Sequence, residues 1–234
     1  MNPLREDVAL ACRALARAGL ASASLGHVSA RIAADRIAVR CRSPQDTGLL
    51  FTRPDAVREV DPADPRPGDG WSVPHELAIH TAFYRARPDV GAVVHVHAPA
   101  AVLCGLAGLP LRPVFGAYDI PAARLALAGV PVFPRAALIT RDELGDELTA
   151  AAAGADVCIM RGHGITTVGS TVAAAVARAL ALEQLARITL DLARLGADAE
   201  ELPDADRAEL PDLGTAFNDD LVWAHHRALD ALHR

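Results

Sequence analysis

The chain has 234 residues, a formal net charge of −6 from 29 acidic and 23 basic side chains, and a hydrophobic fraction of 51%. These values suit one compact domain with a sizeable core, and the lack of a basic run argues against nucleic acid or an anionic membrane as partner. All 23 basic residues are arginine, which excludes a Schiff-base lysine, a pyridoxal phosphate linkage and a Walker A phosphate loop.

Apolar periodicity and turn residues predict the elements in chain order. From the N-terminus we expect a helix at 4–19, strands at 28–32, 36–41 and 49–52, a loop at 61–70, a helix at 75–87, a strand at 91–98 and a helix at 99–108. They are followed by a strand at 130–133, a helix at 141–153, a strand at 156–160, a helix at 171–195, a linker at 196–214 and a helix at 216–232. This alternation predicts an α/β protein with one sheet and helices on its faces.

The domain organisation and the cellular compartment follow from the same reading. We expect one domain over residues 1–197 and a linker with a helical arm over 198–234, which could pack on a neighbouring subunit. The four cysteines form no CxxC pair, and three of them lie in apolar or strand-like surroundings and are expected as core residues in a reducing cytoplasm. The N-terminal segment does not resemble a signal peptide, and no membrane span is expected.

Three histidines form a candidate metal site. His95 and His97 lie two residues apart in an expected strand, so both side chains point to one face and could bind one ion. His163 is flanked by glycines, which let the backbone approach a ligand closely. Because the His-x-His pattern is short and common, three unrelated histidines are the alternative explanation at this point.

The segment HELAIH at 75–80 is not a zincin motif, because its histidines are five residues apart rather than four. Glu76 remains as a candidate acid/base carboxylate, or as an ordinary glutamate favoured by the helix dipole. His80 is expected in the core, whereas the histidines of the terminal helix are expected on the surface: His225, His226 and His233. No GxSxG or GxGxxG motif supports serine hydrolysis or dinucleotide binding.

Taken together, Glu76, the segment RPDVGAVVHVHAPAAV at 87–102 and RGHGITTVG at 161–169 resemble the class II aldolase/adducin family over residues 4–195. The resemblance implies a three-layer α/β fold, with a central mixed or antiparallel sheet flanked by helices, and a homotetramer with active sites at its interfaces. It also implies one divalent metal ion per subunit, bound by His95, His97 and His163. Zinc is expected, and manganese, cobalt and iron are alternatives.

The resemblance also assigns two catalytic residues. Glu76 matches the acid/base carboxylate of the family, which can also bind the metal. Tyr118 falls where the family's aldolases have a tyrosine that reaches a neighbouring site as proton donor. A tyrosine at the start of a helix, with no role in catalysis, is the alternative for Tyr118.

The segments that bind phosphate in the family's sugar-phosphate aldolases differ in this chain. A GN-x-S loop, a Ser/Thr-Gly turn and a pair of serines are replaced by residues 26–29, 43–44 and 74–75, which contain histidine and proline. The side chains found there suit carboxylates and phenolic oxygens better than phosphate. These candidate substrate-binding residues are His27, Arg42, Ser43 and His75, and Arg40 is expected on the same strand face as Arg42.

Segments 26–32, 39–44 and 48–52 further resemble the aromatic-acid decarboxylases of the family. We therefore expect a metal-dependent carbon–carbon lyase that acts on a small anionic substrate and decarboxylates a dihydroxylated aromatic carboxylate such as 3,4-dihydroxyphthalate. An aldolase or epimerase acting on a sugar phosphate or on a non-phosphorylated hydroxy or keto acid is the alternative. A non-catalytic, adducin-like interaction module is the second alternative.

Overall fold

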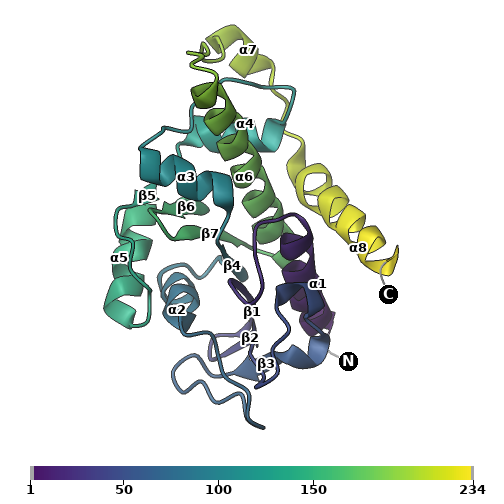
Figure 1. The fold of residues 1–234 in the computed structure, drawn as a ribbon. Coiled ribbons are helices and arrows are strands. Elements are labelled where there is room, and N and C mark those ends of the chain that lie inside the picture. Colours follow the sequence, from purple (N-terminus) through teal and green to yellow (C-terminus); the bar gives the residue numbers. More distant parts are fainter. Residues whose placement is uncertain (1–2, 233–234) are drawn as a thin grey trace.

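A computed structural model describes residues 3–232, which form one seven-stranded sheet covered by helices (Figure 1). The strands are β1 (His27–Ala33), β2 (Arg36–Arg40), β3 (Val57–Val60), β4 (Ala92–Val96), β5 (Val132–Phe133), β6 (Val157–Met160) and β7 (Gly164–Gly169). Their order across the sheet is β3-β2-β1-β4-β7-β6-β5, and the pairs are antiparallel except β5 with β6. The sheet is therefore mixed, with β4 at its centre.

Eight α-helices are present within the described residues. They are α1 (Pro3–Arg17), α2 (Leu77–Ala86), α3 (Pro99–Ala107), α4 (Ile120–Ala128), α5 (Asp142–Ala152), α6 (Val172–Arg194), α7 (Asp204–Glu209) and α8 (Val222–Leu232). Short turns η1 (Leu49–Phe51) and η2 (Pro54–Ala56) precede β3, and the π-helical turn η3 (Ala216–Leu221) leads into α8. None of these helices is long and apolar enough to span a bilayer.

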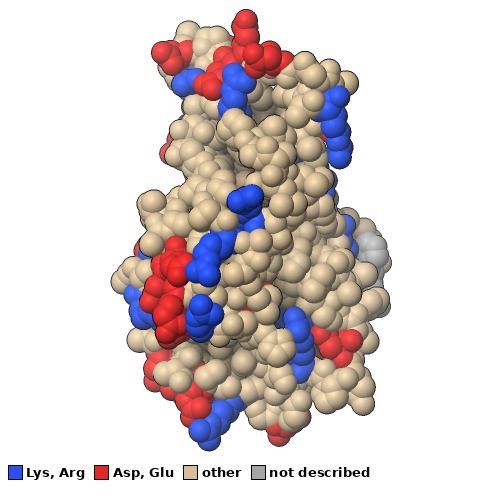
Figure 2. All heavy atoms as spheres, turned by 60° about the vertical axis from the view of Figure 1, so that its left-hand side comes forward, with Lys and Arg blue, Asp and Glu red and all other residues tan. Residues whose placement is uncertain are grey.

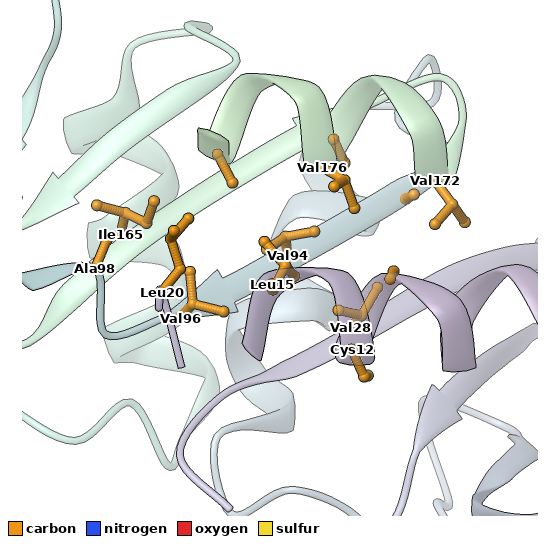
Figure 3. Packing of buried hydrophobic residues seen from close by; sticks show 14 of the residues in the cluster. Cys12, Leu15, Leu20, Val28, Val94, Val96, Ala98, Ile165, Val172 and Val176 are labelled. Carbon is orange, nitrogen blue, oxygen red and sulfur yellow. The ribbon is translucent and has the colours of Figure 1, made fainter. Parts of the chain in front are cut away.

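Strand alternation divides the core between the two faces of the sheet. On one face, side chains of β1, β4 and β7 pack against α1, α3 and α6. Figure 3 shows Val94 and Val96 of β4 in this layer, near Leu15 of α1 and Val176 of α6. On the opposite face Val93 packs in a second cluster with residues of α2 and α5. Consequently His95, which has the same parity as Val93, faces α2.

The expected strand at 49–52 is wrong, because this segment forms the turn η1. Leu49 is buried, but Leu50 and Phe51 are 42% and 62% exposed, so the apolar run does not lie on the sheet. Four elements were not predicted: β3 at the sheet edge, α4 between α3 and β5, β7 within a glycine- and threonine-rich segment, and α7 within the expected linker. The other expected strands and helices are present with shifted ends.

The C-terminal arm packs on α1 of its own chain. Asp230 of α8 accepts hydrogen bonds from Arg13 at 2.6 and 2.7 Å and from Arg17 at 3.1 Å. The expected surface position of His226 is wrong, because this residue is 8% exposed on α8, which packs against α1 and α6. His225 is exposed as expected, and His233 lies outside the described residues.

The surface and the cysteines agree with the composition. On the face drawn in Figure 2, arginine and acidic side chains lie beside one another instead of forming one basic patch. All four cysteines are buried thiols, one more than expected: Cys12, Cys41, Cys104 and Cys158. Burial raises the pKa of each of these thiols to about 11.

Candidate metal centre

Four side chains converge at the end of β4 on the α2 face of the sheet. His95 lies in β4, His97 follows the strand, His163 lies in the turn between β6 and β7, and Glu76 immediately precedes α2. One ligand atom from each of the four lies within 4.8 Å of the others. The structure thus brings together the three histidines and the glutamate that the sequence analysis singled out.

A close backbone approach places His163 beside His97. A Cβ atom added to Gly164 would lie 2.4 Å from the Val96 carbonyl oxygen and 3.2 Å from Cδ2 of His97. Only glycine permits β7 to start this close to β4. The glycine after His163 therefore has a structural role in assembling the cluster.

A buried carboxylate fixes the segment that follows His97. Helix α3 begins at Pro99. The backbone N–H groups of Ala100 and Ala101, which have no acceptor within the helix, both donate to the carboxylate of Glu183 at 3.1 Å each. Glu183 belongs to α6 and is 2% exposed. Although it is far from α3 in the sequence, Glu183 accepts hydrogen bonds from two N-terminal N–H groups of this helix. It therefore anchors the connection between β4 and α3, which carries His97.

Glu76 does not cap α2 with its side chain, which points to the cluster instead. Its Oε1 accepts a hydrogen bond from the Ile139 backbone N–H at 2.8 Å, and its Oε2 lies 3.3 Å from His163 Nε2 and 3.7 Å from His95 Nε2. Burial raises the pKa of this carboxyl group, but His163, His95 and the Ile139 N–H outweigh burial and lower it to about 2. The group is therefore an ionised acceptor.

These residues fit a divalent metal ion. Both ring nitrogens of His95 and of His163 are buried and have no hydrogen-bond partner among the described residues, which is costly unless a ligand binds them. Burial lowers the pKa of His95 and His97, so the imidazoles are neutral ligands. The separations of 3.3 and 3.7 Å from Glu76 Oε2 are close to the about 3.4 Å between two ligands of a tetrahedral ion.

A chain of buried polar groups continues from the cluster into the α2 layer. His27 is the partner of His95 in the β1–β4 register, and their ring centroids are 5.0 Å apart. His27 Nδ1 lies 2.6 Å from His80 Nε2, His80 Nδ1 lies 2.6 Å from Ser29 Oγ, and Ser29 Oγ lies 2.7 Å from Tyr84 Oη. His80 is a core residue as expected, but the sequence analysis missed these contacts. Ser29 and Tyr84 were not predicted at all.

The two strand arginines have different positions. Arg42 is half-buried and donates to the Ser24 carbonyl oxygen at 3.2 Å, and its charge contributes to a lowered pKa of His27, after burial and the neighbouring histidines. The expectation that Arg40 shares this position is wrong, because its side chain is 2% exposed and pairs with Asp46. Arg40 alternates with Val39 onto the α1 face of the sheet, whereas β2 ends before Arg42.

The remaining candidates lie outside the four-residue cluster. Ser43 is half-buried beside Arg42. His75 is exposed and lines a separate cavity of about 330 Å³ together with Thr140 and Arg141. Tyr118 is 71% exposed, and its hydroxyl accepts a hydrogen bond from Gln184 at 3.2 Å.

Residues 6–190 match the Class II Aldolase and Adducin N-terminal domain family. The chain belongs to this family. Among the solved structures of class II aldolases, L-fuculose 1-phosphate aldolase from Glaciozyma antarctica PI12 has the same fold, with a TM-score of 0.78 over 97% of this chain and 90% of that chain at 20% identity. The expected class II aldolase-like fold and the family membership are confirmed.

Two curated relatives of this class II aldolase family member are similar over almost their whole length. The 3,4-dihydroxyphthalate decarboxylase of Arthrobacter keyseri is 46% identical over 230 residues, which cover 96% of this chain and 92% of that protein. The 3,4-dihydroxyphthalate decarboxylase of Rhodococcus jostii (strain RHA1) is 47% identical over 229 residues, covering 96% and 94%.

Proposed function

We propose that the protein is a metal-dependent carboxy-lyase that removes one carboxylate of 3,4-dihydroxyphthalate as carbon dioxide, in the cytoplasmic breakdown of aromatic acids. The similarity of 46–47% over 96% of the chain to two decarboxylases of this substrate carries the proposal. The cluster of Glu76 with three histidines supplies the chemistry that such a reaction needs. An interaction module without catalysis would not require this cluster.

His95, His97 and His163 would hold the ion, which we propose to be zinc, and the Glu76 carboxylate lies close enough to join them. When bound, a divalent ion stabilises the negative charge that develops as the carbon–carbon bond breaks. The chain has no lysine to form an iminium for this purpose. Burial lowers the pKa of His95 and His97, so the lone pairs of these two rings are available to the ion.

Glu76 is the proposed acid/base group. As an ionised carboxylate it accepts the proton of a substrate hydroxyl and delivers it to the ring carbon that loses the carboxylate. The bond between this carbon and the carboxylate breaks, its electron pair stays on the ring carbon, and carbon dioxide leaves. The phenolic oxygen then regains a proton from Tyr118, which recovers its own proton from solvent, and the product is a dihydroxybenzoate.

Arg42, Ser43, His27 and His75 are the proposed substrate-binding residues. Arg42 supplies a planar cation that matches a carboxylate in two hydrogen bonds, and its electrostatic effect on His27 indicates that it lies close to this ring. His27 lies directly beside His95. His75 lines a separate cavity with Arg141, whose cation would attract a second carboxylate of the substrate.

Tyr118 is the proposed proton donor from an adjacent subunit of a homotetramer. Its ring is 71% exposed in the single chain, and it does not belong to the four-residue cluster. An exposed tyrosine with a catalytic role requires a partner surface to enclose it. A homotetramer with active sites at the subunit interfaces provides this surface.

The test is incubation of the zinc-loaded protein with 3,4-dihydroxyphthalate. We expect carbon dioxide and a dihydroxybenzoate in equal amounts, and no products from a variant in which His95 and His97 are both alanine. Cleavage of a hydroxy keto acid or of a sugar phosphate into two carbonyl products, without release of carbon dioxide from the phthalate, would contradict the proposal in favour of an aldolase.

A further inference from the structure

The buried polar chain beside the metal centre consists of four side chains joined by three hydrogen bonds. His27, His80, Ser29 and Tyr84 are 3%, 0%, 0% and 7% exposed, and the three separations are 2.6, 2.6 and 2.7 Å. His80 and Tyr84 are four residues apart on one face of α2, and His27 and Ser29 share one face of β1. The chain therefore joins two elements through a continuous row of donors and acceptors.

Each hydrogen bond in this row contains one proton, so its direction can be counted. A neutral imidazole has one N–H and one lone pair, and a hydroxyl group has one O–H. Burial lowers the pKa of His80 to about 3, against an opposing effect of Glu76, so its ring is neutral. If His80 donates to His27, then Ser29 must donate to His80 and Tyr84 must donate to Ser29. If His80 instead donates to Ser29, either Ser29 donates to Tyr84 and all three bonds are reversed, or Ser29 accepts from both neighbours and its own buried O–H is left without a partner.

Tyr84, at the far end, distinguishes these two directions. In the reversed direction its hydroxyl proton would need an acceptor other than Ser29. The groups near its ring within residues 3–232 are the Arg31 guanidinium, 4.8 Å from the ring centroid, and the Val93 backbone. A guanidinium group has no lone pair to accept a hydrogen bond, and Ser29 Oγ is the hydrogen-bond partner of Tyr84 Oη within the described residues. A reversed chain would leave a buried O–H without a partner, which is unfavourable.

We infer that the chain runs from Tyr84 through Ser29 and His80 to His27, so that His27 carries its proton on Nε2 and presents an N–H group beside the metal centre. His27 Nδ1 is occupied as an acceptor from His80, so the single proton of the neutral His27 ring is on Nε2. His80, Ser29 and Tyr84 are thus positioning residues for the tautomer and orientation of His27.

This assignment restricts what His27 can do. An Nε2–H group donates to an oxygen of the substrate and cannot accept a proton there, so His27 is a binding group and not a base. That the acceptor is a carboxylate oxygen rests on the proposed function, whereas the location of the proton does not. Proton transfer is left to Glu76 and Tyr118.

Neutron diffraction from crystals of the perdeuterated, zinc-loaded protein tests the proton location directly. We expect deuterons on Nε2 of both His27 and His80 and on Tyr84 Oη, directed at Ser29. A deuteron on Nδ1 of His27 would overturn the inference. The map needs no substrate, so a protein without decarboxylase activity that still carries the deuteron on Nε2 would refute only the proposed function.

A matched pair of variants tests the positioning role. Ser29→Ala removes the hydroxyl that donates to His80, whereas Thr167→Val removes a buried hydroxyl in β7 that bonds to the Ala175 carbonyl oxygen, outside the chain. We expect Ser29→Ala to raise KM for 3,4-dihydroxyphthalate about tenfold and to change kcat less than about threefold. Thr167→Val should leave both constants unchanged. Equal KM values for the two variants would contradict the role of the chain.

Discussion

The Ile139 backbone N–H donates to Oε1 of Glu76 at 2.8 Å, and this bond leaves Oε2 directed toward His163 and His95. One oxygen of the carboxylate is therefore fixed by the segment before α5, and the other is available to the metal centre. Oε1 thus orients the carboxylate, and Oε2 is the oxygen available for chemistry.

This separation predicts different effects for two substitutions of Glu76. Glu76→Gln keeps an oxygen that accepts from Ile139, so the free energy of unfolding should change by less than about 1 kcal/mol, but activity should fall by about 100-fold or more. Glu76→Ala leaves the buried N–H unpaired and should cost about 1–3 kcal/mol in addition. Urea unfolding and carbon dioxide release measure the two quantities. Wild-type activity in Glu76→Gln would refute the acid/base role.

The histidine ligands predict a loss of metal. A variant with both His95→Ala and His97→Ala should retain less than about a tenth of an ion per subunit after dialysis, because one imidazole and one carboxylate do not hold a divalent ion firmly. Elemental analysis measures the content, and His225→Ala, which alters an exposed histidine of α8, is the control. Equal metal content in the double variant and the control would refute the site.

Gly164 predicts a packing effect on the metal site. Gly164→Ala places a Cβ atom 2.4 Å from the Val96 carbonyl oxygen, so β7 must move away from β4 at a cost of about 3 kcal/mol. Gly70→Ala is the control, because its Cβ would have no neighbour within 4 Å and only a positive φ opposes it. Thermal unfolding and zinc affinity should both decrease clearly more in Gly164→Ala. A similar, small decrease in both variants would show that the close approach is not required.

The hydrogen bonds of Glu183 predict that this carboxylate, far away in the sequence, stabilises the connection after His97. Glu183→Ala leaves the N–H groups of Ala100 and Ala101 unpaired, which should lower the free energy of unfolding by about 2–4 kcal/mol. Glu143→Ala, at an exposed carboxylate of α5, should change it by less than about 0.5 kcal/mol. Chemical denaturation of the two variants compares these values, and an equal effect would remove Glu183 from the support of α3.

The proposed role of Tyr118 predicts that two inactive variants recover activity when their subunits combine in one oligomer. Tyr118→Phe should lower activity about 100-fold. Co-expression of equal amounts of Tyr118→Phe and Glu76→Gln chains should restore about a quarter of wild-type activity, because a quarter of the interfaces then combine an intact Glu76 with an intact Tyr118. Isolated variants mixed without subunit exchange are the control. No recovery in co-expressed oligomers would place both residues in one subunit or remove Tyr118 from the mechanism.

The cluster of the three histidines could be predicted because its signals are local. His95 and His97 share a strand face by alternation, and the glycine after His163 indicates a close approach. The chain from His27 to Tyr84 could not be predicted, since it depends on how α2 packs across β1. The prediction that Arg40 and Arg42 share one face was wrong for a similar reason. Strand alternation gives the face on which a residue lies, but it does not give the residue at which the strand ends. The burial of His226 depends on where α8 packs, which helical spacing alone does not determine.

The four buried thiols can report local unfolding of the protein, because each becomes reactive only when the region around it opens. A thiol with a pKa of about 11 is almost entirely protonated at neutral pH, and burial also excludes reagents. Alkylation should therefore proceed only through molecules that have transiently opened, at a rate set by the local opening equilibrium. Cys12 lies in α1, Cys41 follows β2, Cys104 lies in α3 and Cys158 in β6. Mass spectrometry of the modified sites would then rank the opening of four regions within one unaltered sequence.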